Sequence, residues 1–326
     1  MKHFLIAGKG YIGNIHADVA PIKSEFLVRR PSNDSDENVY TDFKTAIQNH
    51  PLFLDICTPN SSHPELALSA AEAGLPVYCE KPLASSLAQA KLMEITFAEK
   101  KLYNGVAFNY RFLPCVHLLK SALQQEKLGK LIYYKGAFLH DSYILPRKKA
   151  WRTDISAGGG ALADLGIHLF DLCRFIFGES DVIACEQHIE FPERTQVDEY
   201  ARCTLQSKNI KGYLEISRIS AGRSQENGIE VFGHKGSLRI LFDRPYELEF
   251  YDIGAKKTIV YTADNELLSK LSYPDKKHDM GMFYSSHKAA ITTFISGLET
   301  GITPQTLATF ADGVAAQTML HRALQF

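Results

Sequence analysis

The segment from residue 3 to residue 13 reads His3-Phe4-Leu5-Ile6-Ala7-Gly8-Lys9-Gly10-Tyr11-Ile12-Gly13. An apolar run of strand length leads into three spaced glycines, and a helical pattern follows at once. In this strand–turn–helix context, the spacing G-x-G-x-x-G indicates a turn that binds a dinucleotide. Glycines permit the tight turn, let the backbone approach a pyrophosphate, and let helix and strand pack closely. We expect five residues to contact the cofactor here: Gly8, Gly10, Tyr11, Ile12 and Gly13.

The first third of the chain continues this alternation of short apolar runs and helical patterns. We expect strands at 3–7, 26–29, 52–57, 76–79 and 104–108, and helices at 12–20, 42–48, 64–73 and 85–100. Such alternation is typical of βαβ units and a doubly wound parallel sheet. The sequence therefore predicts a Rossmann domain over residues 1–110.

Beyond about residue 125, strand patterns follow one another with short turns between them, which favours an antiparallel sheet. They lie at 130–140, 181–192, 199–207, 210–219, 228–233, 236–242 and 246–252. Helices are expected at 159–177, 283–298 and 304–324, and a mobile loop at 262–279. The prediction is an α/β domain followed by an α+β domain over 111–326. This second domain, for substrate binding and oligomerisation, has an open, mostly antiparallel sheet and closing helices over 283–324.

Composition narrows the class of protein. The 326 residues are 45% hydrophobic and 22% charged, with a formal net charge of -1, so nothing favours nucleic acid or an anionic membrane as a partner. The first apolar run is too short for a signal peptide, and we expect a cytoplasmic protein. The six cysteines show no C-x-x-C spacing, which favours reduced core thiols over a disulfide framework or a metal site.

The choice between NAD and NADP depends on the end of the second strand. An acid there binds the ribose 2′-hydroxyl of NAD, and an arginine accommodates the 2′-phosphate of NADP. This chain has Val28-Arg29-Arg30-Pro31-Ser32, with no acid before Asp34. Arg29, Arg30 and Ser32 favour NADP, and NAD stays the alternative because Asp34 or Asp36 could reach a ribose.

Two strand ends supply polar groups at the edge where doubly wound sheets bind their ligands. After the third strand come Thr58-Pro59-Asn60 and then His63; Thr58 and Asn60 offer polar groups to the cofactor, and His63 is more typical of a helix start than of a catalyst. The cofactor contacts expected at the two strand ends are Thr58, Pro59, Asn60, His63, Glu80 and Lys81. After the fourth strand comes Glu80-Lys81-Pro82. A lysine at the rim of a cofactor site can bond a substrate hydroxyl and share its proton, with Glu80 as its supporting partner. A solvated lysine before a helix is the alternative.

A third segment, Gly158-Gly159-Gly160-Ala161-Leu162-Ala163-Asp164-Leu165-Gly166-Ile167-His168, places an acid and a histidine at i and i+4. A helix would put both on one face. Histidine suits proton transfer near neutral pH, and an aspartate can orient it. Asp171 is a second candidate partner. A core helix with an incidental polar face is the alternative.

These motifs together resemble the Gfo/Idh/MocA oxidoreductase family. The resemblance rests on Gly8-x-Gly10-x-x-Gly13-x-x-His16, on Thr58-Pro59 with His63, on Glu80-Lys81-Pro82, and on the glycine-rich segment ending at His168. It implies hydride transfer between a nicotinamide and a secondary alcohol of a sugar, nucleotide-sugar, inositol or related polyol. Lys81 and His168 would flank the reacting carbon, and Asp164 would support His168.

The resemblance also implies a substrate side formed by Asn109, Tyr110, Arg111, Trp151 and Arg152, and a homodimer or homotetramer. No metal is expected. One alternative is a cofactor- or sugar-sensing regulator that keeps the fold without the chemistry, although such a regulator is free to lose Lys81 and His168. The other is a dihydrodiol or biliverdin reductase-like enzyme, whose site needs less recognition of hydroxyls.

Overall fold

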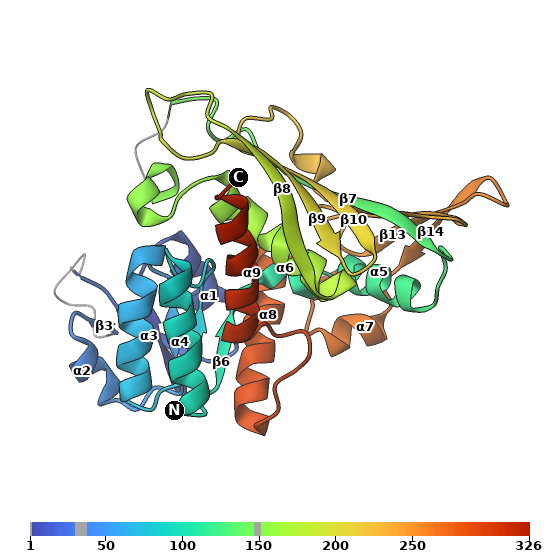
Figure 1. Ribbon diagram of the computed structural model, residues 1–326. Helices are drawn as coiled ribbons and strands as arrows, with labels where there is room; N and C mark the ends of the chain where they lie inside the picture. The colour runs from blue at the N-terminus through green and yellow to red at the C-terminus, as the bar shows by residue number, and fades with distance from the viewer. Residues whose placement is uncertain (1, 30–37, 147–150) are drawn as a thin grey trace. The chain divides into compact units, whose positions relative to one another are not determined.

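The computed structural model describes residues 2–29, 38–146 and 151–326, without the side chains of Trp151 and Ser156 (Figure 1). The chain folds into two compact units. Unit 1 comprises Met1–Phe108 and Phe283–Val314, and unit 2 comprises Asn109–Met282 and Ala315–Phe326. Among the described residues no helix is both long and apolar enough to cross a membrane.

Unit 1 contains a six-stranded parallel sheet in the order β3-β2-β1-β4-β5-β6. Its strands are β1 (His3–Ala7), β2 (Lys23–Leu27), β3 (Val39–Tyr40), β4 (Leu54–Ile56), β5 (Val77–Cys79) and β6 (Asn104–Val106). The direction of the strand order reverses between β1 and β4, and ligands of doubly wound sheets bind at such a switch point. The predicted Rossmann sheet is confirmed, with the two-residue β3 as an addition.

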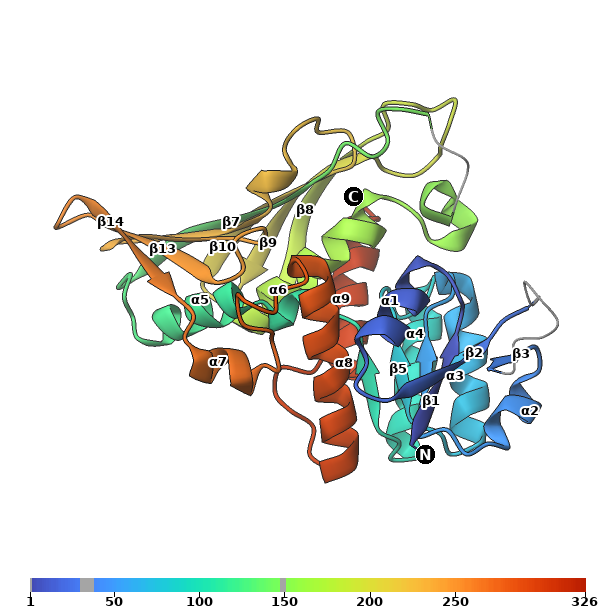
Figure 2. The ribbon, with the colours of Figure 1, turned by 180° about the vertical axis from the view of Figure 1, so that it is seen from behind.

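Helices cover both faces of this sheet (Figure 2). They are α1 (Tyr11–Val19), α2 (Phe43–Ile47), α3 (His63–Glu72), α4 (Leu87–Glu99) and α8 (Met282–Thr300). Helices α1 and α8 pack on the face that carries Phe53 and Tyr78. The ring of Phe294 on α8 lies 4.9 Å from each of these two rings, and the ring of His16 on α1 lies 5.9 Å from Tyr78.

The position of α8 differs from the predicted division of the chain at residue 110. That division placed everything after residue 110 in the second domain, whereas Phe283–Val314 folds into unit 1. The physical reason is burial. Phe294 fills the core under the sheet, Phe310 packs 4.8 Å from Phe97, and the amide of Val106 in β6 donates to the carbonyl of Ala308 at 2.8 Å. Helix α9 (Phe310–Ala323) begins in unit 1 and continues in unit 2.

Unit 2 contains an eight-stranded sheet in the order β14-β13-β12-β11-β7-β10-β9-β8. The strands are β7 (Leu131–Leu139), β8 (Ser180–His188), β9 (Tyr200–Ser207), β10 (Ile210–Ser217), β11 (Gly228–Gly233), β12 (Gly236–Leu241), β13 (Glu247–Asp252) and β14 (Lys257–Thr262). Only the β7–β10 pair is parallel among the pairs of this sheet, which confirms the mostly antiparallel prediction.

Helices α5 (Pro114–Gln124) and α6 (Ile167–Phe177) pack on one face of this sheet (Figure 1), and Phe177 stacks on Tyr134 of β7 at 4.1 Å. The loop predicted at 262–279 was wrong in part, because it contains α7 (Asn265–Lys270). The side chain of Asp264 caps this helix by accepting a hydrogen bond from the amide of Leu267 at 2.8 Å.

Candidate active site

The glycine turn after β1 has the geometry that its spacing predicts. Gly8 has φ +104°, and a Cβ on it would lie 2.9 Å from the carbonyl oxygen of Cys57. A Cβ on Gly13 would lie 2.0 Å from the carbonyl oxygen of Gly8, so β1 and α1 meet only because residue 13 has no side chain. Gly10 precedes the first turn of α1, and nothing lies within 4 Å of where its Cβ would be. The residues present therefore fit a dinucleotide pyrophosphate, which would use this open space and the amides of the helix N-terminus.

The loop after β4 forms the neighbouring part of this edge in unit 1. Asn60 is 2% exposed, and its Nδ2 has no hydrogen-bond partner among the residues described, as expected of an amide that a ligand satisfies. His63 begins α3 and is fully buried, with Nε2 2.8 Å from the carbonyl oxygen of Thr58 and Nδ1 3.1 Å from that of Pro82. Burial lowers the pKa of His63. His63 thus ties the loop after β4 to the Lys81–Pro82 segment, and its contact with a cofactor stays a prediction.

Glu80 and Lys81 follow β5 at the same edge. The backbone amide of Lys81 donates to Oε2 of Glu80 at 3.2 Å, and Lys81 is partly exposed whereas Glu80 is buried. Burial raises the pKa of the Glu80 carboxyl, and the positive charges of His16 and Lys81 oppose this rise. Lys81 thus stands beside a buried acid at the edge that carries the glycine turn, as predicted.

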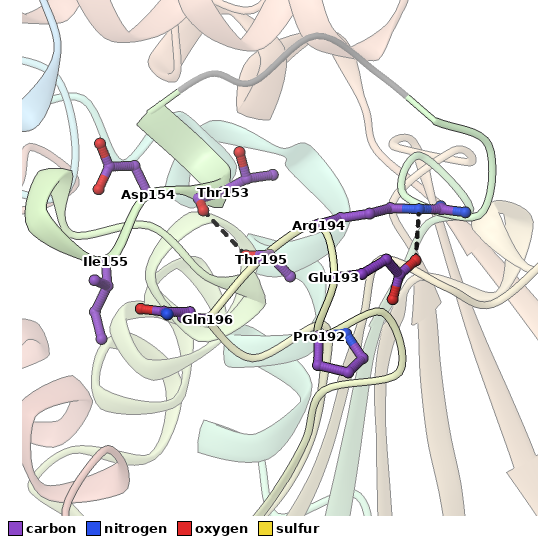
Figure 3. A pocket seen from close by; sticks show the side chains of 8 residues that line it. All are labelled: Thr153, Asp154, Ile155, Pro192, Glu193, Arg194, Thr195 and Gln196. Carbon is purple, nitrogen blue, oxygen red and sulfur yellow. Dashed lines mark hydrogen bonds and ion pairs between the residues drawn. The ribbon is translucent and has the colours of Figure 1, made fainter.

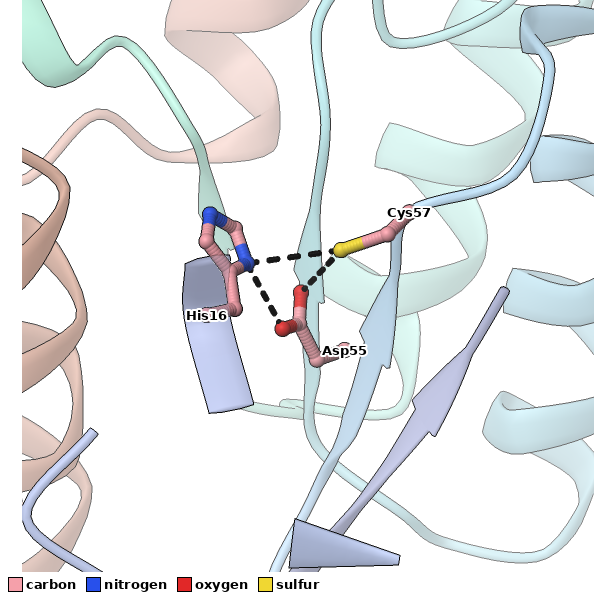
Figure 4. Close-up of side chains that lie close together, drawn as sticks. All are labelled: His16, Asp55 and Cys57. Carbon is pink, nitrogen blue, oxygen red and sulfur yellow. Dashed lines mark hydrogen bonds and ion pairs between the residues drawn. The ribbon is translucent and has the colours of Figure 1, made fainter. Parts of the chain in front are cut away.

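Beneath this edge lies a buried polar cluster that sequence reasoning did not identify (Figure 4). His16 of α1 is fully buried, and its Nδ1 lies 2.7 Å from Oδ2 of Asp55 in β4 and 3.3 Å from Sγ of Cys57. Its Nε2 lies 2.9 Å from Nδ1 of His287 on α8 and 3.7 Å from Oε1 of Glu80. The signal in the sequence was an acid inside a buried strand, which needs a buried partner.

The pKa directions favour His16 over His287 as the protonated histidine of this cluster. Burial alone lowers the pKa of His16, but the charge of Asp55, the hydrogen bond to it and the charge of Glu80 together outweigh burial and raise it. The pKa of His287 lies well below its ordinary value because of burial and then the positive charges of His16 and Lys81. A proton on Nδ1 of His16 would be donated to Asp55, and a proton on Nε2 would be donated to His287.

Three side chains of the cluster, those of His16, Glu80 and His287, also have the chemistry of metal ligands. The distance between the two imidazole nitrogens is that of a hydrogen bond. Two nitrogens bound to one tetrahedral zinc ion at 2.0–2.1 Å would stand about 3.3 Å apart, whereas the two imidazole nitrogens are 2.9 Å apart. A shared proton fits this distance better than a shared ion.

In unit 2 the glycine-rich segment is built around Asp198. The carboxylate of Asp198 accepts a hydrogen bond from the amide of Leu162 at 2.7 Å, and its backbone carbonyl accepts from Ala161 at 2.9 Å. Gly160 has φ +118°, and a Cβ on it would lie 2.2 Å from Oδ1 of Asp198. The segment then forms a π-helical turn (Leu162–Gly166) before α6, where a continuous helix over 159–177 was predicted.

Asp198 provides a pH-dependent test of this arrangement. Burial raises the pKa of Asp198 to about 6, against 3.8 for an exposed aspartate. The folded state therefore binds this proton more tightly, so its contribution to stability is present at low pH and is lost as pH rises from about 4 through 6. We expect about 1.4 kcal/mol of the stability at pH 5 to be absent at pH 7.5 for this reason. Chemical denaturation at both pH values should show that Asp198→Asn removes this difference; an unchanged difference would contradict the assignment.

Asp164 and His168 occupy the π-turn and α6, and both are buried. The carboxylate Oδ2 of Asp164 accepts from Nε of Arg152 at 2.8 Å and is paired with Arg218. The ring of His168 lies 4.8 Å from that of Tyr110 and 5.9 Å from that of Phe138. The structure thus pairs the Asp164 carboxylate with two arginines, and the contact between Asp164 and His168 stays a prediction. Arg152 has a side chain 40% exposed, so it can also reach a ligand.

Arg111 has a different position from the one expected of a substrate ligand. It is 3% exposed, and its Nε and Nη2 donate to the two carboxylate oxygens of Asp171 at 2.8 and 2.6 Å. Asp171, an expected second partner for His168, is thus held by Arg111. This bidentate pair joins η2 (Asn109–Phe112) to α6, which favours a structural role. Asn109 and Tyr110, which were also expected on the substrate side, are buried as well, with exposed fractions of 1% and 7%.

A cavity of about 470 Å³ lies in unit 2 beside the Arg152 segment (Figure 3). Oγ1 of Thr195 donates to the carbonyl of Thr153 at 3.0 Å and joins its two walls, and Arg194 pairs with Glu193 at 3.1 Å. The lining residues are Thr153, Asp154, Ile155, Pro192, Glu193, Arg194, Thr195 and Gln196. Of the other predicted site residues, Arg29 is exposed after β2, whereas Arg30, Ser32 and the side chain of Trp151 lie outside what the structure describes.

Each of the two units contains a segment that matches a known protein family. Residues 2–108 match the oxidoreductase family with an NAD-binding Rossmann fold, and residues 116–239 match the GFO/IDH/MocA C-terminal domain. The chain belongs to the Gfo/Idh/MocA oxidoreductase family, as its motifs predicted.

Two relatives and one solved structure are similar to this chain over most of its length. Glucose-6-phosphate 3-dehydrogenase of Bacillus subtilis (strain 168) is 32% identical over 77% of this chain and 78% of its own length. Levoglucosan dehydrogenase of Pseudarthrobacter phenanthrenivorans is 30% identical over 65% of this chain and 61% of its own length. A solved structure of levoglucosan dehydrogenase, in complex with NADH and levoglucosan, has a TM-score of 0.87 at 25% identity, over 99% of this chain and 97% of that one.

Proposed function

We propose that this protein is an NAD(P)-dependent dehydrogenase that oxidises a secondary alcohol of a sugar or related polyol, or reduces the corresponding ketone. The observation that carries the proposal is the edge of unit 1, where a glycine turn with open space at Gly10 stands with Lys81 and its buried partner Glu80. The names of the relatives, which act on levoglucosan and glucose 6-phosphate, support the substrate class.

The residues divide the work as follows in this proposal. His168 removes the hydroxyl proton during oxidation, and Lys81 holds the oxygen and stabilises the charge that builds on it. The bound nicotinamide would supply the hydride acceptor. Asp164 keeps His168 in position, and Asp164 is itself paired with Arg152 and Arg218. Arg152 would bind a hydroxyl or an acid group of the substrate.

For the cofactor, we propose that NADP is accepted at least as well as NAD. The support is the segment Val28-Arg29-Arg30-Pro31-Ser32, in which two arginines and a serine stand where an NAD enzyme has an acid.

Arg30→Ala tests this preference. Removing a guanidinium that pairs with the 2′-phosphate should lower kcat/KM for NADP about tenfold or more, since a charge-assisted contact is worth about 1.5–3 kcal/mol. The value for NAD should change less than about twofold, because NAD has no 2′-phosphate. Steady-state rates with both cofactors measure this. Equal losses with both would show that Arg30 does not read the phosphate.

A substrate panel tests the activity itself. Sugars, inositols, sugar phosphates and nucleotide-sugars would be offered with NAD and with NADP, and the nicotinamide absorbance would be followed. Turnover of at least one compound is expected. Tight cofactor binding with silence across the panel would overturn the proposal in favour of a sensing protein of the same fold.

A further inference from the structure

The polar cluster under the Lys81 edge joins three segments that are distant in the sequence. His287 of α8 contacts His16 of α1 at 2.9 Å, and His16 contacts Asp55 of β4 at 2.7 Å. All three side chains are buried, with 3% exposure or less. The titratable groups around the two imidazoles come from α1, β4, β5, the segment after β5, and α8: His16, Asp55, Cys57, Tyr78, Glu80, Lys81 and His287.

The imidazole Nε2 of His16 has two acceptors within reach. It lies 2.9 Å from Nδ1 of His287 and 3.7 Å from Oε1 of Glu80. Only the first distance is that of a hydrogen bond. Oε1 of Glu80 is buried and has no hydrogen-bond partner in the described parts of the chain, while Oε2 accepts from the amide of Lys81 at 3.2 Å. Nδ1 of His287 is thus the nearer of the two acceptors for a proton on Nε2 of His16.

We propose that His287 is a positioning residue for Lys81. By accepting from His16, it keeps the His16 side chain away from direct hydrogen bonding with Glu80 and leaves the Glu80 carboxylate to hold the Lys81 backbone and to balance the Lys81 charge. Without this acceptor, His16 turns to Glu80, and the carboxylate is shared between an imidazolium and Lys81. This inference rests on the role given to Lys81 under the proposed function.

The side chain of His287 is also fixed against α1 by aromatic packing. The ring of Phe283 meets it edge-on at 4.7 Å, and Phe283 stacks on Tyr11 at 6.2 Å. Tyr11 is the first residue of α1, directly after Gly10 of the glycine turn. The same face of α8 therefore contacts both the start of α1 and the cluster under Lys81.

Two substitutions in the full-length protein separate positioning from packing. His287→Leu removes the acceptor, and His287→Asn keeps one because the amide oxygen of Asn can stand near the place of Nδ1. We expect His287→Leu to lower kcat about tenfold, the effect of losing one hydrogen bond to a charged group, with KM changed less than about twofold. His287→Asn should recover most of the rate. Phe294→Leu on the same helix is the control: it loses core packing and thermal stability but should retain kcat.

A second measurement does not depend on turnover. The rate at which acetic anhydride labels Lys81 would be followed across pH by mass spectrometry of the peptide that contains Lys81. The four proteins are the wild type, His287→Leu, His287→Asn and Phe294→Leu. A shift of the labelling profile in His287→Leu, absent in His287→Asn and Phe294→Leu, supports the positioning role. Identical labelling and identical kcat in all four would overturn it. If labelling shifts but the wild-type protein oxidises nothing in the substrate panel, the proposed function fails and the positioning role stands.

Discussion

Lys81→Ala and His168→Ala are each expected to lower kcat by about 10²–10⁴, the range in which positioned proton-transfer groups act. Lys81 loses the ammonium beside Glu80, and His168 loses the base that removes the hydroxyl proton. Cofactor affinity should change little, because the glycine turn that binds the phosphates is untouched. Steady-state kinetics and cofactor fluorescence titration measure the two quantities.

The control for this pair is Lys135→Ala, which removes an equally charged side chain from a surface pair with Glu230 at 2.7 Å in unit 2. It should keep kcat. Near-normal turnover in either Lys81→Ala or His168→Ala would remove that residue from the chemistry. If Lys81→Ala lost cofactor affinity but kept its kcat, Lys81 would be shown to bind the cofactor without taking part in the reaction.

Arg111→Ala is expected to lower the free energy of unfolding by about 3–5 kcal/mol, because it leaves the buried Asp171 carboxylate without its partner. Asp171 is 1% exposed, and the pair makes two hydrogen bonds of 2.6 and 2.8 Å. Chemical denaturation followed by circular dichroism measures the change. If Arg111 bound substrate instead, the variant would keep its stability and raise KM.

The matched control replaces both partners, as Arg111→Met with Asp171→Leu. Two apolar side chains of similar volume remove the desolvated charges together, and such exchanges are often neutral or stabilising. The double variant should therefore be more stable than Arg111→Ala. A double variant as unstable as the single one would indicate that the packing of Arg111 against Phe175, 5.0 Å away, carries the stability.

Local patterns sufficed for the Rossmann sheet and for the glycine turn. The alternation of strands and helices and the spacing of three glycines are short-range properties, and each of the turn glycines has the steric reason that the motif implies. The helix-start signals of α5 and α7 were missed. Pro114 at the start of α5 and Asp264 at the cap of α7 both mark helices, but their segments are short and weakly patterned.

Partnerships across the chain could not be predicted from spacing. His16 and His287 are 271 residues apart, and nothing in either neighbourhood indicates that α8 returns to unit 1. Arg111 shows the same dependence on tertiary packing. A guanidinium in a segment near the substrate was expected to bind it, but whether an arginine faces a ligand or a buried acid depends on tertiary packing.

The return of α8 to unit 1 has a consequence for how the protein is made. Residues up to Phe108 leave the ribosome before α8, yet one face of their sheet can be covered only in part, by α1, until Phe283–Val314 has been synthesised. Roughly 170 residues intervene, which at about 5–20 residues per second corresponds to on the order of 10–30 s of translation. During this interval Phe53 and Tyr78 lack the ring of Phe294 that packs on them in the folded protein. Nascent chains released before α8 are thus expected to be clients of chaperones that bind exposed aromatic surface, whereas chains that include α8 are not.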